Sequence, residues 1–376
     1  MDDNRSRRNT HGADVLRGVA ILMVVGYHAA FSSLFGISFP WAGMARDFGP
    51  SPSPTTLAFY PLSLGWAGVS LFFVLSGFCI HFSTLRAGET RWGHFFWRRF
   101  WRIYPAYFLA LVAFACLGKL DLGTADGSKQ FLTHALFLHN VSEQTLFGIN
   151  PSFWSIAAEV QLYLLFPAFL AIRSRFGTKG ALVVAFLIGC AWRGIAVAAW
   201  GLPDHVISAV FASPLTCWFD WILGAYVAER FFADRPAFRS PGAWLAVLVP
   251  AFVASTLYRP ATLFSFTLAA GIAAVVLDAA LRREWRRSSL AGPLGSIGLV
   301  SYSLYLWHQP LVVPLKRALD ARVGSPLAWV GLASALLLGS WISYHLFEKS
   351  GVRLGETLWK RRPRVVPIEA RMAATA

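Results

Sequence analysis

Residues 16–28 read LRGVAILMVVGYH, an apolar run with an arginine near its start and a histidine at its end. In a helix, the step from Arg17 to His28 covers about 16 Å, roughly half of a hydrocarbon core of about 30 Å. Ionisable side chains at such depth cost about 2.5–3.5 kcal/mol each on insertion scales. Arg17 and His28 are therefore candidates for chemistry carried out inside a membrane.

The composition also indicates a membrane protein. Of the 376 residues, 56% are hydrophobic and 14% are charged, whereas soluble domains carry roughly 25% charged residues. Most of the chain must therefore face lipid or other apolar helices. The net charge of +15 would also suit a nucleic-acid-binding protein. Here, however, Arg and Lys cluster in short stretches between apolar runs, which is typical of topology signals and argues against nucleic acid as a partner.

The apolar runs predict an all-α fold and a polytopic membrane protein with about ten transmembrane helices. The expected spans are residues 14–34, 62–84, 101–119, 153–173, 179–200, 206–231, 241–258, 261–282, 292–316 and 326–347. Residues 1–350 are expected to form one membrane domain, and residues 351–376 a basic cytoplasmic tail.

The distribution of Arg and Lys predicts the orientation of the chain. Basic residues are concentrated in every second connection, for example residues 86–102 and 282–287, and in both terminal segments. Because such residues mark the cytoplasmic side, both termini are predicted to be cytoplasmic. One connection breaks the pattern, since it places three basic residues outside: Lys316, Arg317 and Arg322.

This orientation assigns a depth to each polar group. His28, Glu159 and His308 come from three different predicted helices and fall at a similar height in the outer half of the membrane. Arg17 lies near the cytoplasmic face, together with three arginines of the next basic stretch: Arg98, Arg99 and Arg102. A basic mouth below an acid–base chamber suits an anionic donor from the cytoplasm and an acceptor from outside.

Each candidate also has a purely structural interpretation. Arg17 could pair with Asp14, and Glu159 could neutralise Arg193. The two histidines could bond backbone carbonyls or lie in an aromatic belt, and the three clustered arginines could serve only as topology signals. Two further acids within spans are expected to be structural partners of arginines: Asp220 and Asp278.

Five motifs carry a resemblance to a known family. They are Arg17-x10-His28, SLFFVLSGF at 70–78, RRFWRIYPAY at 98–107, FWS-x3-E-x3-Y at 153–163, and SYSLYLWHQP at 301–310. Together and in this order, they resemble the bacterial integral-membrane acyltransferase family 3 over residues 14 to about 350. Two positions depart from the family pattern: Gln161 stands in place of a second acid, and Ser350 follows Lys349 where a proline is common.

The resemblance implies an O-acyltransferase that moves an acyl group, with acetyl the expected one, from cytoplasmic acyl-CoA to a hydroxyl. The implied acceptor is a cell-envelope carbohydrate or a small glycoside, and the implied location is the inner (plasma) membrane. The resemblance gives His28 a catalytic role with Arg17 as its companion, and Glu159 and His308 complete the expected catalytic group. The donor, acetyl-CoA, is expected to bind at three arginines: Arg98, Arg99 and Arg102.

A different class of protein uses the same residue types. A non-enzymatic, proton-coupled transporter would need an intramembrane His and Glu as a proton relay, but repeats with broken helices, which would favour it, are not evident. The residues leave open the acceptor, the acyl chain, and whether His28 is a general base or a nucleophile.

Metal and disulfide chemistry are not expected in this chain. The four cysteines have no paired spacing, so neither a disulfide framework nor a metal site is expected. They are predicted to be inert core residues: Cys79, Cys116, Cys190 and Cys217.

Overall fold

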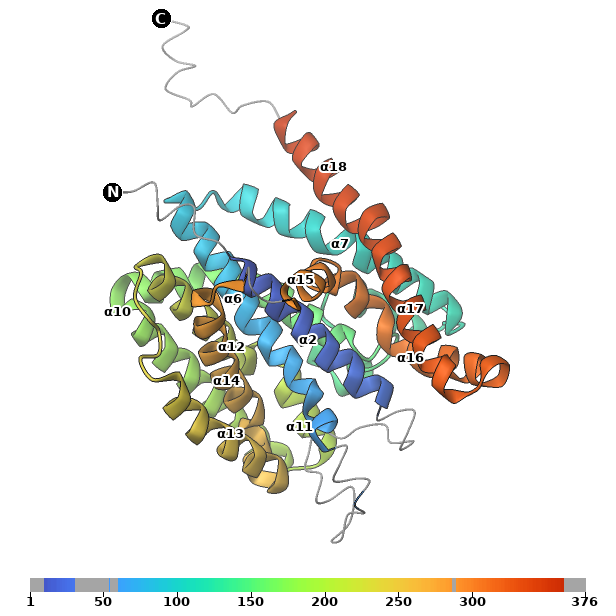
Figure 1. Cartoon of the computed structure of the whole chain (residues 1–376), viewed down its shortest axis with the longest axis horizontal. Helices are drawn as coiled ribbons and strands as arrows, with labels where there is room; N and C mark the ends of the chain where they lie inside the picture. The colour runs from blue at the N-terminus through green and yellow to red at the C-terminus, as the bar shows by residue number, and fades with distance from the viewer. Residues whose placement is uncertain (1–9, 31–53, 55–59, 286–288, 362–376) are drawn as a thin grey trace, which may run out of the picture.

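The computed structural model describes residues 10–30, 54, 60–285 and 289–361, and these residues form helices joined by short connections (Figure 1). No strand occurs among them, which confirms the all-α prediction. The helices of eight or more residues are α2 (His11–Ala30), α6 (Gly68–Ala87), α7 (Trp92–Leu117), α8 (Ala125–Ala135), α10 (Phe153–Trp200), α11 (Asp204–Ala212), α12 (Pro214–Phe232), α13 (Pro241–Leu257), α14 (Ser265–Arg282), α15 (Ala291–Leu299), α16 (Ser301–Val323), α17 (Ser325–Ser343) and α18 (Lys349–Lys360). Short helical turns complete the chain: α5 (Tyr60–Ser63), η2 (Leu64–Ala67), η3 (His139–Val141), α9 (Glu143–Leu146), η4 (Arg259–Phe264) and the π-helical η6 (Tyr344–Glu348).

Several helices are long and apolar enough to cross a membrane. Within the described residues six meet this test, or seven if the bent pair α11 and α12 is one span. The stretch α10 contains two of the predicted spans, 153–173 and 179–200, and its backbone leaves helical geometry between them at Gly177 (φ 68°). The predicted span 292–316 is interrupted between α15 and α16 at Val300. The count of ten therefore stays a prediction.

The cytoplasmic termini also stay a prediction. Residues 1–9 and 362–376 lie outside the described residues, and so does most of the predicted outer loop 35–61. Residues 349–360 of the predicted tail form α18, which packs against α7 (Figure 1). The division of the chain at residue 350 is not tested by these observations.

The centre of the molecule depends on close approach between helices. The helices α2 and α6 run side by side, and α12 packs along α6 (Figure 1). A Cβ atom on Gly77 of α6 would lie 1.8 Å from the carbonyl oxygen of Trp221. A Cβ atom on Gly224 of α12 would lie 1.8 Å from the carbonyl oxygen of Val74. Small residues on both helices thus allow backbone contact, as in other membrane helix pairs.

Residues 118–152 form a cap segment between α7 and α10. Asn140 in this segment exchanges side-chain hydrogen bonds with Gln161 of α10, at 2.8 and 2.9 Å. Gln161 also donates to the carbonyl oxygen of Phe137 at 2.8 Å. Gln161 is one of the two departures from the family pattern, and here its amide fastens the cap segment to α10 without a charge.

Two histidines are buried within the cap segment. The rings of His134 and His139 stack in parallel, with centroids 4.0 Å apart. Burial lowers the pKa of His134 to about 4. Burial, with the neighbouring His134, lowers the pKa of His139 to about 3. Both rings are therefore neutral at pH 7.

Three charged side chains, one each on α12, α14 and α16, have an oppositely charged neighbour. Asp278 accepts from the backbone N–H groups of residues 237 and 238 and pairs with Arg282 at 3.1 Å, which confirms its structural role. Asp220 lies within electrostatic reach of Arg193. The ammonium of Lys316 is 2.7 Å from the carboxylate of Asp320. This pairing explains why Lys316 departs from the topology pattern, since its charge is compensated within the helix.

Candidate active site

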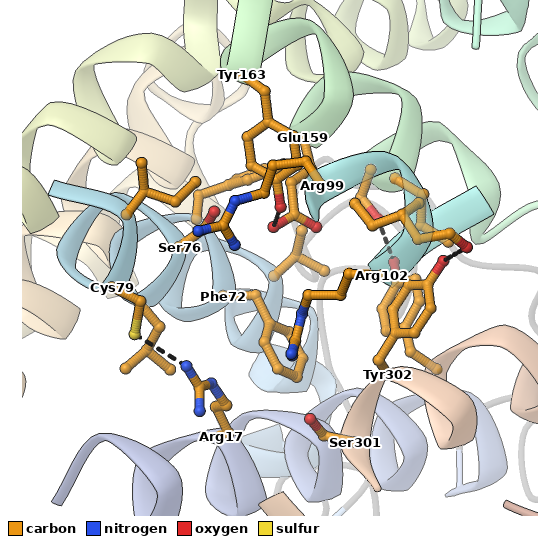
Figure 2. Close-up of a pocket in the computed structure, with 18 of the residues that line it drawn as sticks. Arg17, Phe72, Ser76, Cys79, Arg99, Arg102, Glu159, Tyr163, Ser301 and Tyr302 are labelled. Atoms are coloured by element: carbon orange, nitrogen blue, oxygen red, sulfur yellow. Dashed lines mark hydrogen bonds between the residues drawn. The ribbon is translucent and has the colours of Figure 1, made fainter. Parts of the chain in front are cut away.

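A cavity of about 280 Å³ opens between α2, α6, α7, α10 and α16 (Figure 2). It collects residues from all five motifs that the sequence singles out. Its charged and polar wall is formed by Arg17, Ser76, Cys79, Ser83, Arg98, Arg99, Arg102, Ser155, Glu159, Tyr163, Ser301, Tyr302 and Tyr305. The apolar wall consists of Val69, Phe72, Phe73, Leu75, Ile80, Ile103 and Ile156. The structure thus brings Arg17, the three arginines of α7 and Glu159 together in one site.

Arg17 is held by neighbours on two helices. Its Nη1 atom pairs with the carboxylate of Asp14 one turn earlier, so the predicted ion pair is present. Its Nη2 atom donates to the Cys79 sulfur of α6 at 2.9 Å, as Figure 2 shows. The guanidinium therefore faces the cavity in addition to satisfying Asp14.

The arginines of α7 are positioned by aromatic and acidic neighbours. The Arg99 guanidinium lies over the rings of Phe95 and Tyr163, at 5.5 and 5.7 Å from the centroids. The guanidinium of Arg102 is 4.0 Å from the buried carboxylate of Glu348. Arg17 and Arg102 also line an adjoining cavity of about 350 Å³ beside α15 and η6. The arginine cluster thus extends from one cavity into the next.

Glu159 belongs to the arginine cavity. The hydroxyl of Tyr163, one turn further along α10, donates to its Oε1 atom at 2.6 Å (Figure 2). Arg193 donates instead to the Leu263 carbonyl and to Thr267, at 2.8 and 2.7 Å. The alternative that Glu159 only neutralises Arg193 is therefore wrong.

The two histidines form a separate pair. His308 Nε2 lies 3.1 Å from His28 Nδ1, and His28 Nδ1 is also 3.0 Å from the Val24 carbonyl oxygen. His308 Nδ1 is 2.8 Å from the carbonyl oxygen of Tyr305. The expectation of one polar pocket shared by both histidines and Glu159 is therefore wrong, because Glu159 sits among the arginines.

The hydrogen bonds determine which ring nitrogens carry the protons when both histidines are neutral. A backbone carbonyl can only accept, so His308 Nδ1 carries the proton and His308 Nε2 becomes the acceptor. His28 Nδ1 must then carry its own proton, which it shares between His308 and Val24. The remaining nitrogen, His28 Nε2, then carries an available lone pair. That is the atom a general base or a nucleophile requires.

Tyr305 connects the two sites. Its side chain lines the arginine cavity, and its backbone carbonyl accepts from His308. The Tyr305 hydroxyl is 2.6 Å from the Ser155 hydroxyl, and it donates to the Ser152 carbonyl at 3.2 Å. Sequence reasoning missed this residue, although Tyr302 and Tyr305 stand one helical turn apart in a quoted motif and so share a face.

The cysteines are only partly as predicted. All four are free, and Cys217 is buried, as expected for a core residue. The prediction is wrong for Cys116, which is exposed on α7. It is also wrong for Cys79, because the half-buried thiol lines the cavity and accepts from Arg17. Within the described part of the chain, no three His, Cys, Asp or Glu side chains gather to form a candidate metal site.

The fold and the cavity define a polytopic helical membrane protein with a charged site enclosed by its helices. The acyltransferase domain family matches residues 10–345. The chain therefore belongs to the acyltransferase family 3, and the resemblance carried by the five motifs is confirmed.

Curated relatives include several bacterial proteins. The chain is 28% identical to the peptidoglycan O-acetyltransferase OatA of Listeria monocytogenes, over 86% of this chain and 52% of the relative. It is 27% identical to the putative peptidoglycan O-acetyltransferase YrhL of Bacillus subtilis, over 90% and 54% respectively. It is 25% identical to the putative membrane-bound transacylase BcsY of Komagataeibacter xylinus, over 90% and 82%. The chain thus spans about half the length of the first two relatives, and no solved structure matches it.

Proposed function

We propose that this protein is an inner-membrane O-acetyltransferase that takes an acetyl group from cytoplasmic acetyl-CoA and delivers it to a hydroxyl of a cell-envelope carbohydrate. The proposal is carried by one observation: four arginines and Glu159 line one cavity that reaches Tyr305, whose carbonyl orients the histidine pair. The names of the relatives support the acetyl group and the carbohydrate class.

The arginines provide the donor site in this proposal. A CoA thioester carries phosphates, and planar guanidinium groups bind phosphate oxygens through strong, paired hydrogen bonds. Arg99 is held by aromatic rings, so little conformational freedom is lost on binding. The adjoining cavity at Arg17 and Arg102 gives room for the remainder of a long donor.

His28 supplies the acid–base chemistry. Its free Nε2 atom accepts the proton of the acceptor hydroxyl while that oxygen attacks the thioester carbonyl carbon. The carbon–sulfur bond then breaks, CoA leaves as the thiolate, and the proton passes from the imidazolium to the thiolate or to water. His308 holds His28 in the required tautomer and acts as a positioning residue. A route with His28 as a transient acyl carrier uses the same nitrogen.

Glu159 acts within the donor cavity. Its carboxylate opposes the charges of the surrounding arginines, and the Tyr163 hydroxyl fixes its orientation. With four arginines and one carboxylate, the cavity keeps a net positive charge, which favours binding of an anionic donor. The carboxylate reduces that charge, which favours release of CoA.

Acyl transfer itself gives the direct test. Membranes that contain the protein are supplied with acetyl-CoA labelled in the acetyl group, and label is then measured in peptidoglycan and other envelope glycans. Transfer above that of membranes without the protein supports the proposal. Absence of transfer to any glycan fraction, with the protein present at normal abundance, contradicts it.

Cys79 gives an independent test of the donor site. A permeant maleimide should label Cys79, and acetyl-CoA or CoA should protect it, because the thiol lines the proposed donor cavity. Cys116 is the internal control, since it is exposed on α7 and does not line that cavity. Labelling at each cysteine is read by peptide mass spectrometry. Equal labelling of Cys79 with and without saturating CoA would remove the donor assignment.

A further inference from the structure

The donor cavity has two chemically different ends. At one end, Arg17 bonds Cys79, and Arg99 lies over Tyr163 beside Glu159. At the other end, the hydroxyls of Ser155 and Tyr305 are 2.6 Å apart and the rings of Phe72 and Tyr305 meet edge to face at 6.0 Å. Along the axis of α6, Cys79 and Phe72 are seven residues apart, a rise of about 10 Å.

The end at Phe72 is mostly apolar, and its two hydroxyls, of Ser155 and Tyr305, are hydrogen-bonded to each other. Its remaining wall comes from the aliphatic and aromatic side chains of Val69, Phe73 and Ile156. Phe73 packs against Trp154 with centroids 6.3 Å apart, and Tyr305 is anchored through its hydroxyl to the first turn of α10. The wall therefore cannot yield to a larger group without breaking these contacts.

The phosphates and the thioester carbonyl of a donor have different requirements. The phosphates need the arginine end, whereas the alkyl part of an acyl group gains by leaving water for the apolar end. We propose that Phe72 and Tyr305 form an end wall that limits the donor to short acyl groups. This inference rests on the proposed function, and it assigns the selection of the acyl chain to two residues.

The end wall also places the acyl group next to the reaction site. The ring of Tyr305 lines the cavity, and the backbone carbonyl of Tyr305 accepts from His308. The ring centroids of Tyr305 and His308 are 5.3 Å apart. An acyl group that stops at this wall lies on the side of the cavity nearest the histidine pair. A chain too long for the space would push the thioester back toward the arginines.

Chain-length dependence of donor binding tests the inference. Protection of Cys79 from maleimide is titrated with CoA and with acetyl-, butyryl- and hexanoyl-CoA. In the unmodified protein, butyryl-CoA should require at least about 10-fold more donor than acetyl-CoA, since one methylene too many in a fitted pocket costs about 10- to 200-fold. Phe72→Ala should remove this difference, and the milder Phe72→Leu should reduce it.

A matched variant separates selection from general damage. Phe78→Ala makes the same substitution two turns further along α6, in a buried ring that packs against Phe82 and does not line the cavity. It should leave the ratio of butyryl- to acetyl-CoA unchanged.

Two results would overturn the inference. One is equal protection by acetyl- and hexanoyl-CoA in the unmodified protein, and the other is an unchanged ratio in both Phe72 variants. Either result leaves the donor site standing. Failure of every CoA compound to protect Cys79 would instead overturn the proposed donor site, and the end wall with it.

Discussion

His308 Nε2 lies 3.1 Å from His28 Nδ1, although the two residues are 280 positions apart in the chain. The contact joins α2 to α16. It leaves His28 Nε2 without a proton and outside the hydrogen bond between the two rings. The orientation of the reactive imidazole is thus set by a helix near the other end of the sequence. An acid–base site of this kind depends on the packing of α16 as much as on α2 itself.

The first prediction concerns the order of importance within the histidine pair. His28→Ala should lower acetyl transfer by about 10²- to 10⁴-fold, the typical loss when a general base is removed. His308→Phe should cause a smaller loss, because it removes only the acceptor that fixes the tautomer of His28. Transfer of labelled acetyl to envelope glycans gives the measurement, with protein abundance determined in parallel.

The amide variant of His308 provides the control. His308→Gln retains an oxygen that can accept from His28 Nδ1, so it should recover part of the activity that His308→Phe loses. A merely structural role would give equal losses in both variants with reduced abundance. Near-normal transfer by His28→Ala would end the assignment of His28 as the base.

The second prediction concerns the arginines. Arg98→Gln with Arg99→Gln should raise the CoA concentration that protects Cys79 by about 100-fold or more, because a hydrogen bond to a charged group contributes about 1.5–3 kcal/mol. Arg102 is left intact, since its removal would strand the buried Glu348 carboxylate. Arg175→Gln, an exposed arginine of α10 outside the cavity, should change nothing. Unchanged protection in the double variant would leave Arg98 and Arg99 as topology signals only.

The sequence was sufficient to predict the class of fold and most of the arginine site. Apolar runs of about 20 residues leave few alternatives to membrane helices, because unsatisfied backbone groups are too costly in lipid. An orientation and a residue count are enough to place Arg17 at the depth of the arginines of α7, and these residues do line one cavity. The same count predicts one height for both histidines, and their rings are in contact.

The rest of the site depends on helix rotation, which residue counts do not determine. Glu159 has the expected depth, but its side chain faces Tyr163 and the arginine cavity rather than the histidines. Tyr305 and Cys79 are typical lipid-facing or core residues by composition, and only the packing of α6 and α16 against α2 turns them toward the cavity. The backbone break at Gly177, by contrast, falls between residues 153–173 and 179–200, which the hydropathy pattern predicts as two separate spans.

The third prediction separates charge from shape at Glu159. Glu159→Gln keeps an oxygen that can accept from the Tyr163 hydroxyl but removes the negative charge among the arginines. Transfer should fall by about 10- to 100-fold, the equivalent of about 1.5–3 kcal/mol for a charged hydrogen bond. Tyr163→Phe should have a smaller effect, because the carboxylate remains. Initial rates at saturating acetyl-CoA provide the comparison. Equal rates for Glu159→Gln and the unmodified protein would show that the charge of Glu159 has no part in transfer and that the side chain only fills space.

The fourth prediction concerns the response of the cap segment to acid. The pKa values of His134 and His139 fall to about 4 and about 3 on folding, from the ordinary value of 6.5. The unfolded segment therefore binds more protons below pH 6.5, so the stability of the cap decreases as the pH drops from there toward 3–4. Hydrogen exchange in residues 125–150 should be faster at pH 5 than at pH 7 after correction for the intrinsic rate. His139→Phe keeps a stacked ring and should weaken this dependence, whereas an identical dependence in the variant would exclude His139 as its source.

The last prediction concerns the side of the membrane on which the donor site opens. The arginine pattern places the α6–α7 connection in the cytoplasm and the cap segment outside. A reporter fused after Arg91 should therefore give a cytoplasmic signal, and a reporter fused at Gly127 an external one. A third fusion near Arg361 should agree with Arg91, because the tail is also expected inside. An external signal at Arg91 would place the arginine cavity on the wrong face for cytoplasmic acetyl-CoA, and the proposed donor would have to be abandoned even if His28 proved essential.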